Sequence, residues 1–162
     1  MHAISPAIRE LAVRRAGPLA RARVNWTGSR DPRTTLKSMR WLVDGMNVIG
    51  TRPDAWWKDR DAAMLRLVDQ LERWAANDDE DVTVVFERPP SPPIRSTVID
   101  VAHAPKPKRN AADDEIVRRL RADADPGAVR VVTSDRWLAD RAWAAGASVE
   151  GSDSFRTRLE TI

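Results

Sequence analysis

Short apolar runs alternate with amphipathic segments from about residue 40 to the end of the chain, and this alternation constrains the fold most strongly. Three runs stand out: Trp41–Val43, Val82–Phe86 and Val129–Val132. Short, nearly continuous apolar runs are typical of strands that are buried on both faces of a parallel sheet. The alternation therefore predicts a three-layer α/β/α domain with a mostly parallel central sheet.

The pattern also predicts the individual elements. The expected strands cover residues 41–49 (running into a turn), 81–87, 98–102, 129–133 and 147–150. The expected helices cover residues 59–76, 111–122 and 137–145, with a last helix from about residue 152. Gly146 is expected to end the third helix in the left-handed conformation. Right-handed crossovers bring the carboxyl ends of parallel strands to one edge, where ligands bind in such sheets.

Residues 1–39 differ from the rest and are expected to form a basic N-terminal arm, either disordered or partly helical, ahead of a domain at 40–162. Residues 1–40 hold nine Lys and Arg against two acidic residues, whereas the remaining residues hold 18 against 22. The sequence pI of 9.9 therefore comes from the arm. A basic arm on a mildly acidic domain indicates either a polyanionic partner or a solvated tail.

The composition excludes several classes of protein. The chain has no Cys, which rules out disulfide scaffolds, thiolate zinc sites and cysteine nucleophiles. It has two His, one of them His2, so a histidine-pair nuclease or a multi-histidine metal site is difficult to build. No apolar run approaches the roughly 20 residues of a membrane span, and no signal peptide is visible. We therefore expect a soluble cytoplasmic protein that does not bind membranes.

Asp44 is the first candidate for chemistry, together with Asn47. Asp44 interrupts an apolar strand, where a carboxylate is costly unless it is paired, bound to a metal or close to the strand end. A structural alternative stays open, because Asp44-Gly45 is also the dipeptide of a tight hairpin turn.

Two further acidic motifs follow expected strands. The first places Asp113 and Asp114 in the opening turn of the helix at 111–122, and the second is Ser134-Asp135. Each has a structural explanation as well, since Asn110 with Asp113 resembles a capping box, and Ser134 or Asp135 is an ordinary helix cap.

Taken together, the three motifs predict a metal site. The topology would bring Asp44, Asp113 and Asp135 to one edge, where their carboxylates repel and raise one another's pKa. A hard divalent cation relieves that repulsion, and ligand oxygens without Cys favour Mg²⁺ or Mn²⁺. Such ions activate water for phosphodiester hydrolysis. The neutral Asn47 and Ser134 are expected to orient ligands or water.

The order and spacing of these motifs resemble the NYN branch of the PIN-like ribonucleases, and the YacP-like NYN domains most of all. The segments that carry the resemblance are Leu42–Ile49, Ala112–Ile116 and Val132–Arg136. The resemblance extends over residues 40–162 and implies a PIN-like fold with metal-dependent endoribonuclease activity on RNA.

The resemblance assigns catalytic roles residue by residue. It matches Asp44 and Asn47 to the first-strand acid and amide, Asp113 with Asp114 to the acids that open the central helix, and Asp135 with Ser134 to the acid after the fourth strand. Met46 replaces the aromatic residue that often lies between the first acid and the amide. A fourth acid near the last strand would be either Glu150 or Asp153.

Basic and aromatic residues near these motifs are candidates for RNA contact. The predicted phosphate-binding residues are Lys106, Lys108, Arg109 and Arg136. Trp56-Trp57 either stack on unpaired bases or pack a loop over a helix. Trp137 and Trp143 are expected to pack their helix onto the sheet.

Two rival functions remain. A phosphatase of the haloacid-dehalogenase type would use Asp44 as a nucleophile, but that chemistry needs a second Asp two residues later, where this chain has Met46. A non-catalytic RNA-binding module on the same fold is the other rival. It is disfavoured because a cluster of carboxylates that faces the phosphates of RNA contributes nothing to binding alone.

Overall fold

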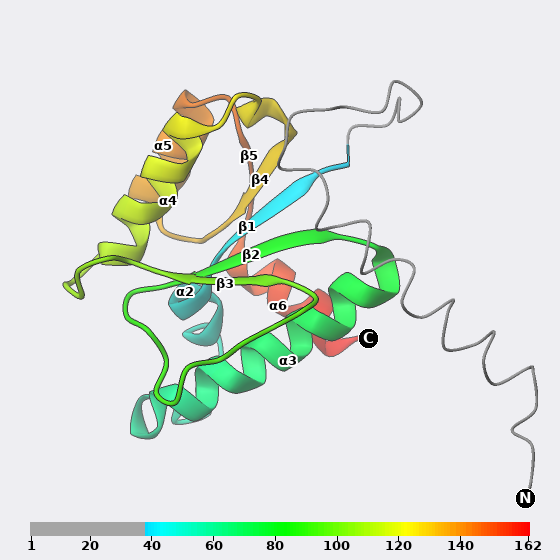
Figure 1. Cartoon of the computed structure of the whole chain (residues 1–162), viewed down its shortest axis with the longest axis vertical. Helices are drawn as coiled ribbons and strands as arrows, with labels where there is room; N and C mark the ends of the chain where they lie inside the picture. Colours follow the sequence, from blue (N-terminus) through cyan, green and yellow to red (C-terminus); the bar gives the residue numbers. More distant parts are fainter. Residues whose placement is uncertain (1–37) are drawn as a thin grey trace, which may run out of the picture. The chain divides into compact units, whose positions relative to one another are not determined.

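The computed structural model describes residues 38–162, which form a parallel sheet between two layers of helices (Figure 1). The strands are β1 Arg40–Asp44, β2 Asp81–Phe86, β3 Asp100–His103, β4 Val129–Val132 and β5 Ser148–Glu150. The helices are α2 Gly45–Ile49, α3 Arg60–Asp78, α4 Ala111–Ala122, α5 Arg136–Ala144 and α6 Ser152–Glu160, with 3₁₀ turns η2 Trp56–Lys58 and η3 Pro126–Ala128. The expected α/β fold is confirmed. The proposed basic arm lies outside the described residues, apart from its last two positions.

The order of the strands explains where a site can form. The sheet has five strands in the order β3-β2-β1-β4-β5, and all neighbouring pairs are parallel. The chain adds β2 and β3 on one side of β1 and then returns to add β4 and β5 on the other side. The strand order therefore switches between β1 and β4, and the carboxyl ends of such strands border the ligand-binding crevice in open α/β sheets.

Both faces of the sheet are buried, as the apolar runs predict. Val43 and Val84 pack into a core with α3 and α6, whereas the adjacent Leu42 and Val85 pack into a second core with α4 and α5. Figure 1 shows these helix pairs on opposite faces of the sheet. Because successive side chains of a strand point to opposite faces, a strand between two helix layers needs apolar residues at nearly every position.

The first strand is shorter than its sequence suggests. We expected a strand over residues 41–49, but β1 ends at Asp44 and α2 begins at Gly45. The hairpin alternative at Asp44-Gly45 is also wrong, since β1 pairs in parallel with β2 and β4. A Cβ atom at Gly45 would lie 2.5 Å from the ring of Phe86, so glycine lets the chain turn into a helix against the neighbouring strand.

The remaining elements follow the expected pattern with small shifts. Gly146 has a φ of 96° and ends α5 as predicted. The expectation for Trp137 and Trp143 was wrong, because they are 42% and 58% exposed. The side of α5 that faces the sheet consists instead of the smaller residues Leu138, Ala139 and Ala142. Within residues 38–162, no helix combines the length and the apolar character that crossing a bilayer requires.

The close contact at Gly45 gives a test of this account. We expect Gly45→Ala to lower the free energy of unfolding by about 1–3 kcal/mol, because the added methyl group overlaps Phe86. Chemical denaturation with urea measures this change. Gly127→Ala is the matched control, since its Cβ would meet Asp125 at an ordinary 3.6 Å, and we expect a change below about 1 kcal/mol. Equal stability of the two variants would contradict the proposed role of Gly45.

Candidate active site

Asp44 ends the central strand at the switch point, and its side chain is buried. It is 4% exposed, and the hydroxyl of Thr133 donates a hydrogen bond of 3.1 Å to its Oδ2 atom. Thr133 directly follows β4, so this bond joins the carboxyl ends of the two strands on either side of the switch. The same hydroxyl oxygen accepts a bond of 3.1 Å from the backbone N–H of Asp135. One buried threonine thus links the first candidate acid to the loop that carries the last one.

Asp113 projects from the first turn of α4 and is 9% exposed. The capping-box explanation is wrong, because Asn110 has a left-handed backbone with φ 61° and makes no side-chain capping bond. Asp114 points elsewhere, since it is exposed and lies 3.1 Å from the ammonium of Lys108. Of the two acids that open this helix, Asp113 is therefore the one that faces the site.

Asp135 has a structural role as well as its position at the site. Its Oδ1 atom accepts a hydrogen bond of 2.9 Å from the backbone N–H of Leu138 and caps α5. The capping alternative is thus correct for this residue. The cap also fixes the direction of the carboxylate, which acts electrostatically on both Asp44 and Asp113.

Burial and neighbouring acids raise the pKa values of Asp44 and Asp113. Burial raises the pKa of Asp44 to about 7, and the charge of Asp113 adds to this effect, while the Thr133 hydroxyl opposes it. Burial also raises the pKa of Asp113 to about 6, with a further contribution from Asp135. Within residues 38–162, no Lys or Arg forms an ion pair with any of these three carboxylates. We call Asp44, Asp113 and Asp135 the acid cluster.

Glu87 is a further acid at this edge that the sequence analysis missed. It follows β2 directly, and its charge contributes to the raised pKa of Asp113. An acid in the first position after a buried strand was the signal that could have identified it. The alternatives considered for a fourth acid have other partners, since Glu150 pairs with Arg158 at 2.9 Å and Asp153 pairs with Arg52 at 2.8 Å.

Asn47 holds the elements around the acid cluster together. Its Oδ1 atom accepts hydrogen bonds from the backbone N–H of Ser134 at 2.8 Å and from the hydroxyl of Ser152 at 2.6 Å. The hydroxyl of Ser134 accepts a bond of 2.9 Å from the backbone N–H of Ser152. These bonds connect α2, the loop after β4 and the start of α6, so Asn47 and Ser134 position the site through the backbone.

The acid cluster suits a hard divalent cation by its chemistry. Its donors are oxygens, they repel one another, and burial adds to the cost of their charge. Within the described part of the chain, however, no three His, Asp or Glu side chains are already arranged around a common ion position. A cation would therefore have to draw the carboxylates closer together.

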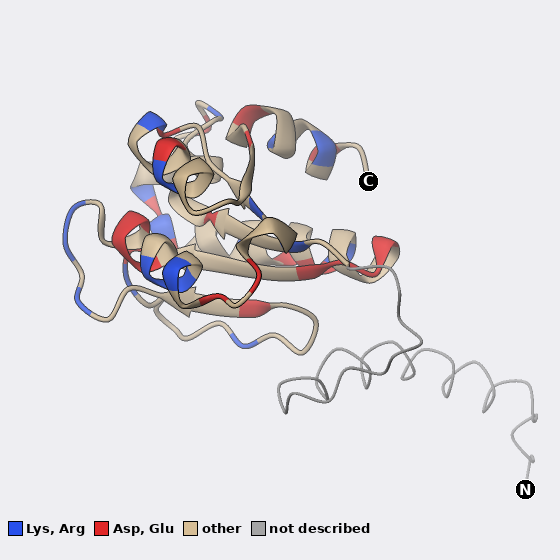
Figure 2. Ribbon diagram, turned by 90° about the horizontal axis from the view of Figure 1, so that it is seen from above, with Lys and Arg blue, Asp and Glu red and all other residues tan. Residues whose placement is uncertain are grey.

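The basic candidates lie around the acid cluster. Figure 2 shows basic residues along the loop before α4, beside the acidic first turn of that helix. Lys106, Lys108 and Arg109 belong to this loop, and Arg136 is the first residue of α5; all four are exposed. Their contact with RNA stays a prediction.

The parallel five-stranded sheet with acids near its switch point agrees with the class of PIN-like folds that the sequence motifs predict. Within this class, the chain belongs to the YacP-like NYN domain family, whose model matches residues 41–162.

The solved structures agree on the fold. The crystal structure of Rae1 (YacP) from Bacillus subtilis is similar, with a TM-score of 0.60 and 23% sequence identity over 75% of this chain and 74% of that chain. A mutant of the same protein gives a TM-score of 0.60 and 22% identity over 76% of each chain. No curated protein gives a significant match to this sequence.

The raised pKa of Asp44 predicts how stability depends on pH. The folded chain retains a proton that the unfolded chain releases near pH 4, so stability falls as the pH rises from about 4 to about 7. Asp44→Asn removes this loss. With divalent cations removed by EDTA, we expect the variant to be more stable than the wild type at pH 8 by up to about 4 kcal/mol, and the two to converge near pH 4.

Urea unfolding at the two pH values measures the difference. Asp69→Asn, which changes an exposed aspartate in the middle of α3, is the control and should leave the pH dependence as it is in the wild type. If the free energy of unfolding of Asp44→Asn and of the wild type changed with pH in the same way, the pKa of Asp44 would not be raised by burial.

Proposed function

We propose that this protein is a metal-dependent endoribonuclease that hydrolyses internal phosphodiester bonds of RNA. The observation that supports this most directly is the acid cluster, in which the carboxylates of three separate elements act on one another electrostatically, the pKa values of Asp44 and Asp113 are raised, and no Lys or Arg of residues 38–162 forms an ion pair with the cluster. Membership of a PIN-like nuclease family adds to it. The cysteine-free composition is consistent with action in the cytoplasm.

The residues of the acid cluster would hold the cation. Asp44, Asp113 and Asp135 are the proposed ligands, and Mg²⁺ or Mn²⁺ fits their oxygen donors. When bound, such an ion supplies an activated water and stabilises the charge that develops on the phosphate. Asp114, which is exposed and paired with Lys108, would assist only through its charge, which contributes to the raised pKa of Asp113, while Asn47 and Ser134 keep the loop after β4 in place.

The basic residues provide affinity for the RNA backbone. Lys106 and Arg109 are exposed in the loop shortly before Asp113, and Arg136 is exposed directly after Asp135. Contacts of this kind neutralise phosphates without reading the sequence. They would hold the RNA against an edge that is otherwise negatively charged.

A non-catalytic RNA-binding module is the second candidate. One observation favours it, because no three acidic or histidine side chains in the described residues are already arranged around an ion. Against it stands the cost of keeping Asp44 buried, since a carboxylate with a raised pKa destabilises the fold near neutral pH and contributes nothing to phosphate binding.

Cleavage of an RNA substrate in the presence of Mn²⁺ tests the proposal. We expect the wild-type chain to cut the RNA internally, EDTA to abolish the reaction, and Asp44→Asn or Asp113→Asn to lower kcat by about 100-fold or more, since each removes a proposed ligand. Gel analysis of end-labelled RNA gives the rates.

Asp69→Asn again serves as the matched control, because it removes one carboxylate from an exposed position on α3. Binding of RNA without any metal-dependent cleavage would support the non-catalytic module instead. Cleavage that persists in Asp44→Asn would place the chemistry elsewhere.

A further inference from the structure

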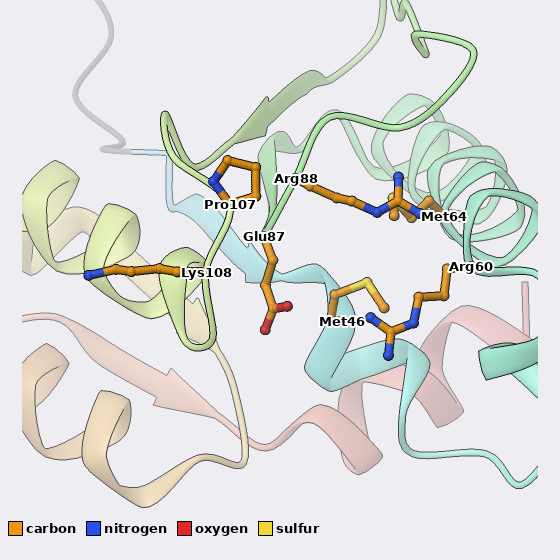
Figure 3. Close-up of a pocket in the computed structure, with 7 residues that line it drawn as sticks. All are labelled: Met46, Arg60, Met64, Glu87, Arg88, Pro107 and Lys108. Atoms are coloured by element: carbon orange, nitrogen blue, oxygen red, sulfur yellow. The ribbon is translucent and has the colours of Figure 1, made fainter.

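A pocket opens beside the acid cluster and is not explained by the proposed metal site. It has a volume of about 270 Å³ and lies between α2, the start of α3 and the loops that follow β2 and β3 (Figure 3). The residues that matter for its chemistry are Met46, Arg60, Met64, Glu87, Arg88 and Lys108. Its volume is close to the lower end of small-molecule sites, which fits one nucleotide-sized group.

Two methionines form the apolar part of the pocket, of which Met46 is partly exposed and Met64 is a 1% exposed core residue at its base. Met46 comes from α2, two residues after Asp44, and Met64 comes from the first turns of α3. Figure 3 shows the side chain of Met46 directed toward the space between Glu87 and Arg60. Methionine is polarisable and makes favourable contacts with aromatic rings, so this wall suits a flat base.

Three cations line the same pocket, and they differ in what they already bind. Arg88 is paired with Asp61 at 2.8 Å, and Lys108 is paired with Asp114 at 3.1 Å. Arg60 forms no ion pair within residues 38–162. It is exposed at the start of α3, and its guanidinium lies 5.5 Å from the ring centre of Trp56. Arg60 therefore keeps its hydrogen-bond donors for an anionic ligand such as a phosphate.

Glu87 connects the pocket to the acid cluster. Its side chain lines the pocket, and its charge acts on Asp113. Met46 makes a second connection, since it follows Asp44 by two residues. A ligand in the pocket would therefore lie directly next to the proposed point of cleavage.

We propose that the pocket receives one unpaired nucleotide of the RNA, next to the phosphate that is cleaved. Its base lies against Met46, above the buried Met64, and a phosphate of the same strand binds Arg60. The substrate is then single-stranded RNA, because a base inside a duplex is stacked and paired and cannot enter a side pocket. This inference rests on the proposed function for the chemistry, but the binding step can be measured without catalysis.

The methionine methyl groups provide a direct probe. The chain has four methionines, and Met39, which precedes β1, does not line the pocket. With ¹³C-methyl methionine in the full chain and EDTA present, we expect adenosine 5′-monophosphate to shift the Met46 and Met64 signals in a saturable way and to leave Met39 unchanged. Ribose 5-phosphate should bind more weakly, since it lacks the base. Equal shifts from both ligands would overturn the proposal.

A variant tests the phosphate contact. Arg60→Ala should weaken nucleotide binding about tenfold, as expected for the loss of one charged hydrogen-bonding group. Arg73→Ala is the matched control, because Arg73 is exposed further along α3 and does not line the pocket. Equal binding by the two variants would contradict the assignment of Arg60.

A cleavage experiment separates this inference from the proposed function. The wild-type chain with Mn²⁺ should cut a short single-stranded RNA at least about tenfold faster than the same strand in a duplex. Equal cleavage of both forms would overturn the pocket proposal and leave the nuclease intact. Methionine shifts without cleavage of either form would support a nucleotide pocket and contradict the nuclease.

Discussion

The burial of one carboxylate at the end of the central strand is the constraint on which the rest of the structure depends. Asp44 is 4% exposed and has a pKa of about 7, so near neutral pH its charge opposes folding. The fold tolerates this because β1 is paired on both sides and because Thr133 donates a hydrogen bond to the carboxylate. The glycine that follows lets the chain turn away at once, which leaves the carboxylate at the open edge of the sheet.

Hydrogen bonds within the fold hold Asp135 and the elements around the acid cluster in place. Asp135 caps α5 with one oxygen, and Asn47 joins α2 to Ser134 and Ser152. Repulsion among the acids would otherwise push the loops apart, since like charges in a buried site are costly. The bonds at Asn47 link three elements across this edge and so oppose that movement. Asn47 thus positions the site without adding charge, whereas Asp135 both caps a helix and contributes charge.

Most of the fold could be predicted because its signals are local. The bounds of α4 match the expected 111–122, and the strands follow from runs of apolar residues that a two-sided sheet requires. The end of β1 could not be predicted, since it depends on the contact between Gly45 and Phe86 from another strand. The prediction for Trp137 and Trp143 was wrong because it rested on the size of their apolar side chains, whereas the face of α5 that packs on the sheet consists of smaller residues.

For the site, the sequence indicated which acids follow the strands but not which of their atoms are already in use. It offered a helix cap as one explanation of Asp135 without deciding for it, and it did not identify Glu87, whose charge acts on Asp113. The cap is local, since Asp135 and Leu138 are three residues apart, whereas the effect of Glu87 on Asp113 arises from the packing of elements that are distant in the chain. The packing of these elements also brings opposite charges close together. The acid cluster lies at the switch point, and Arg60 lines the adjoining pocket. Carboxylates repel the phosphates of RNA, so the affinity of the proposed RNA substrate has to come from nearby cations such as Arg60.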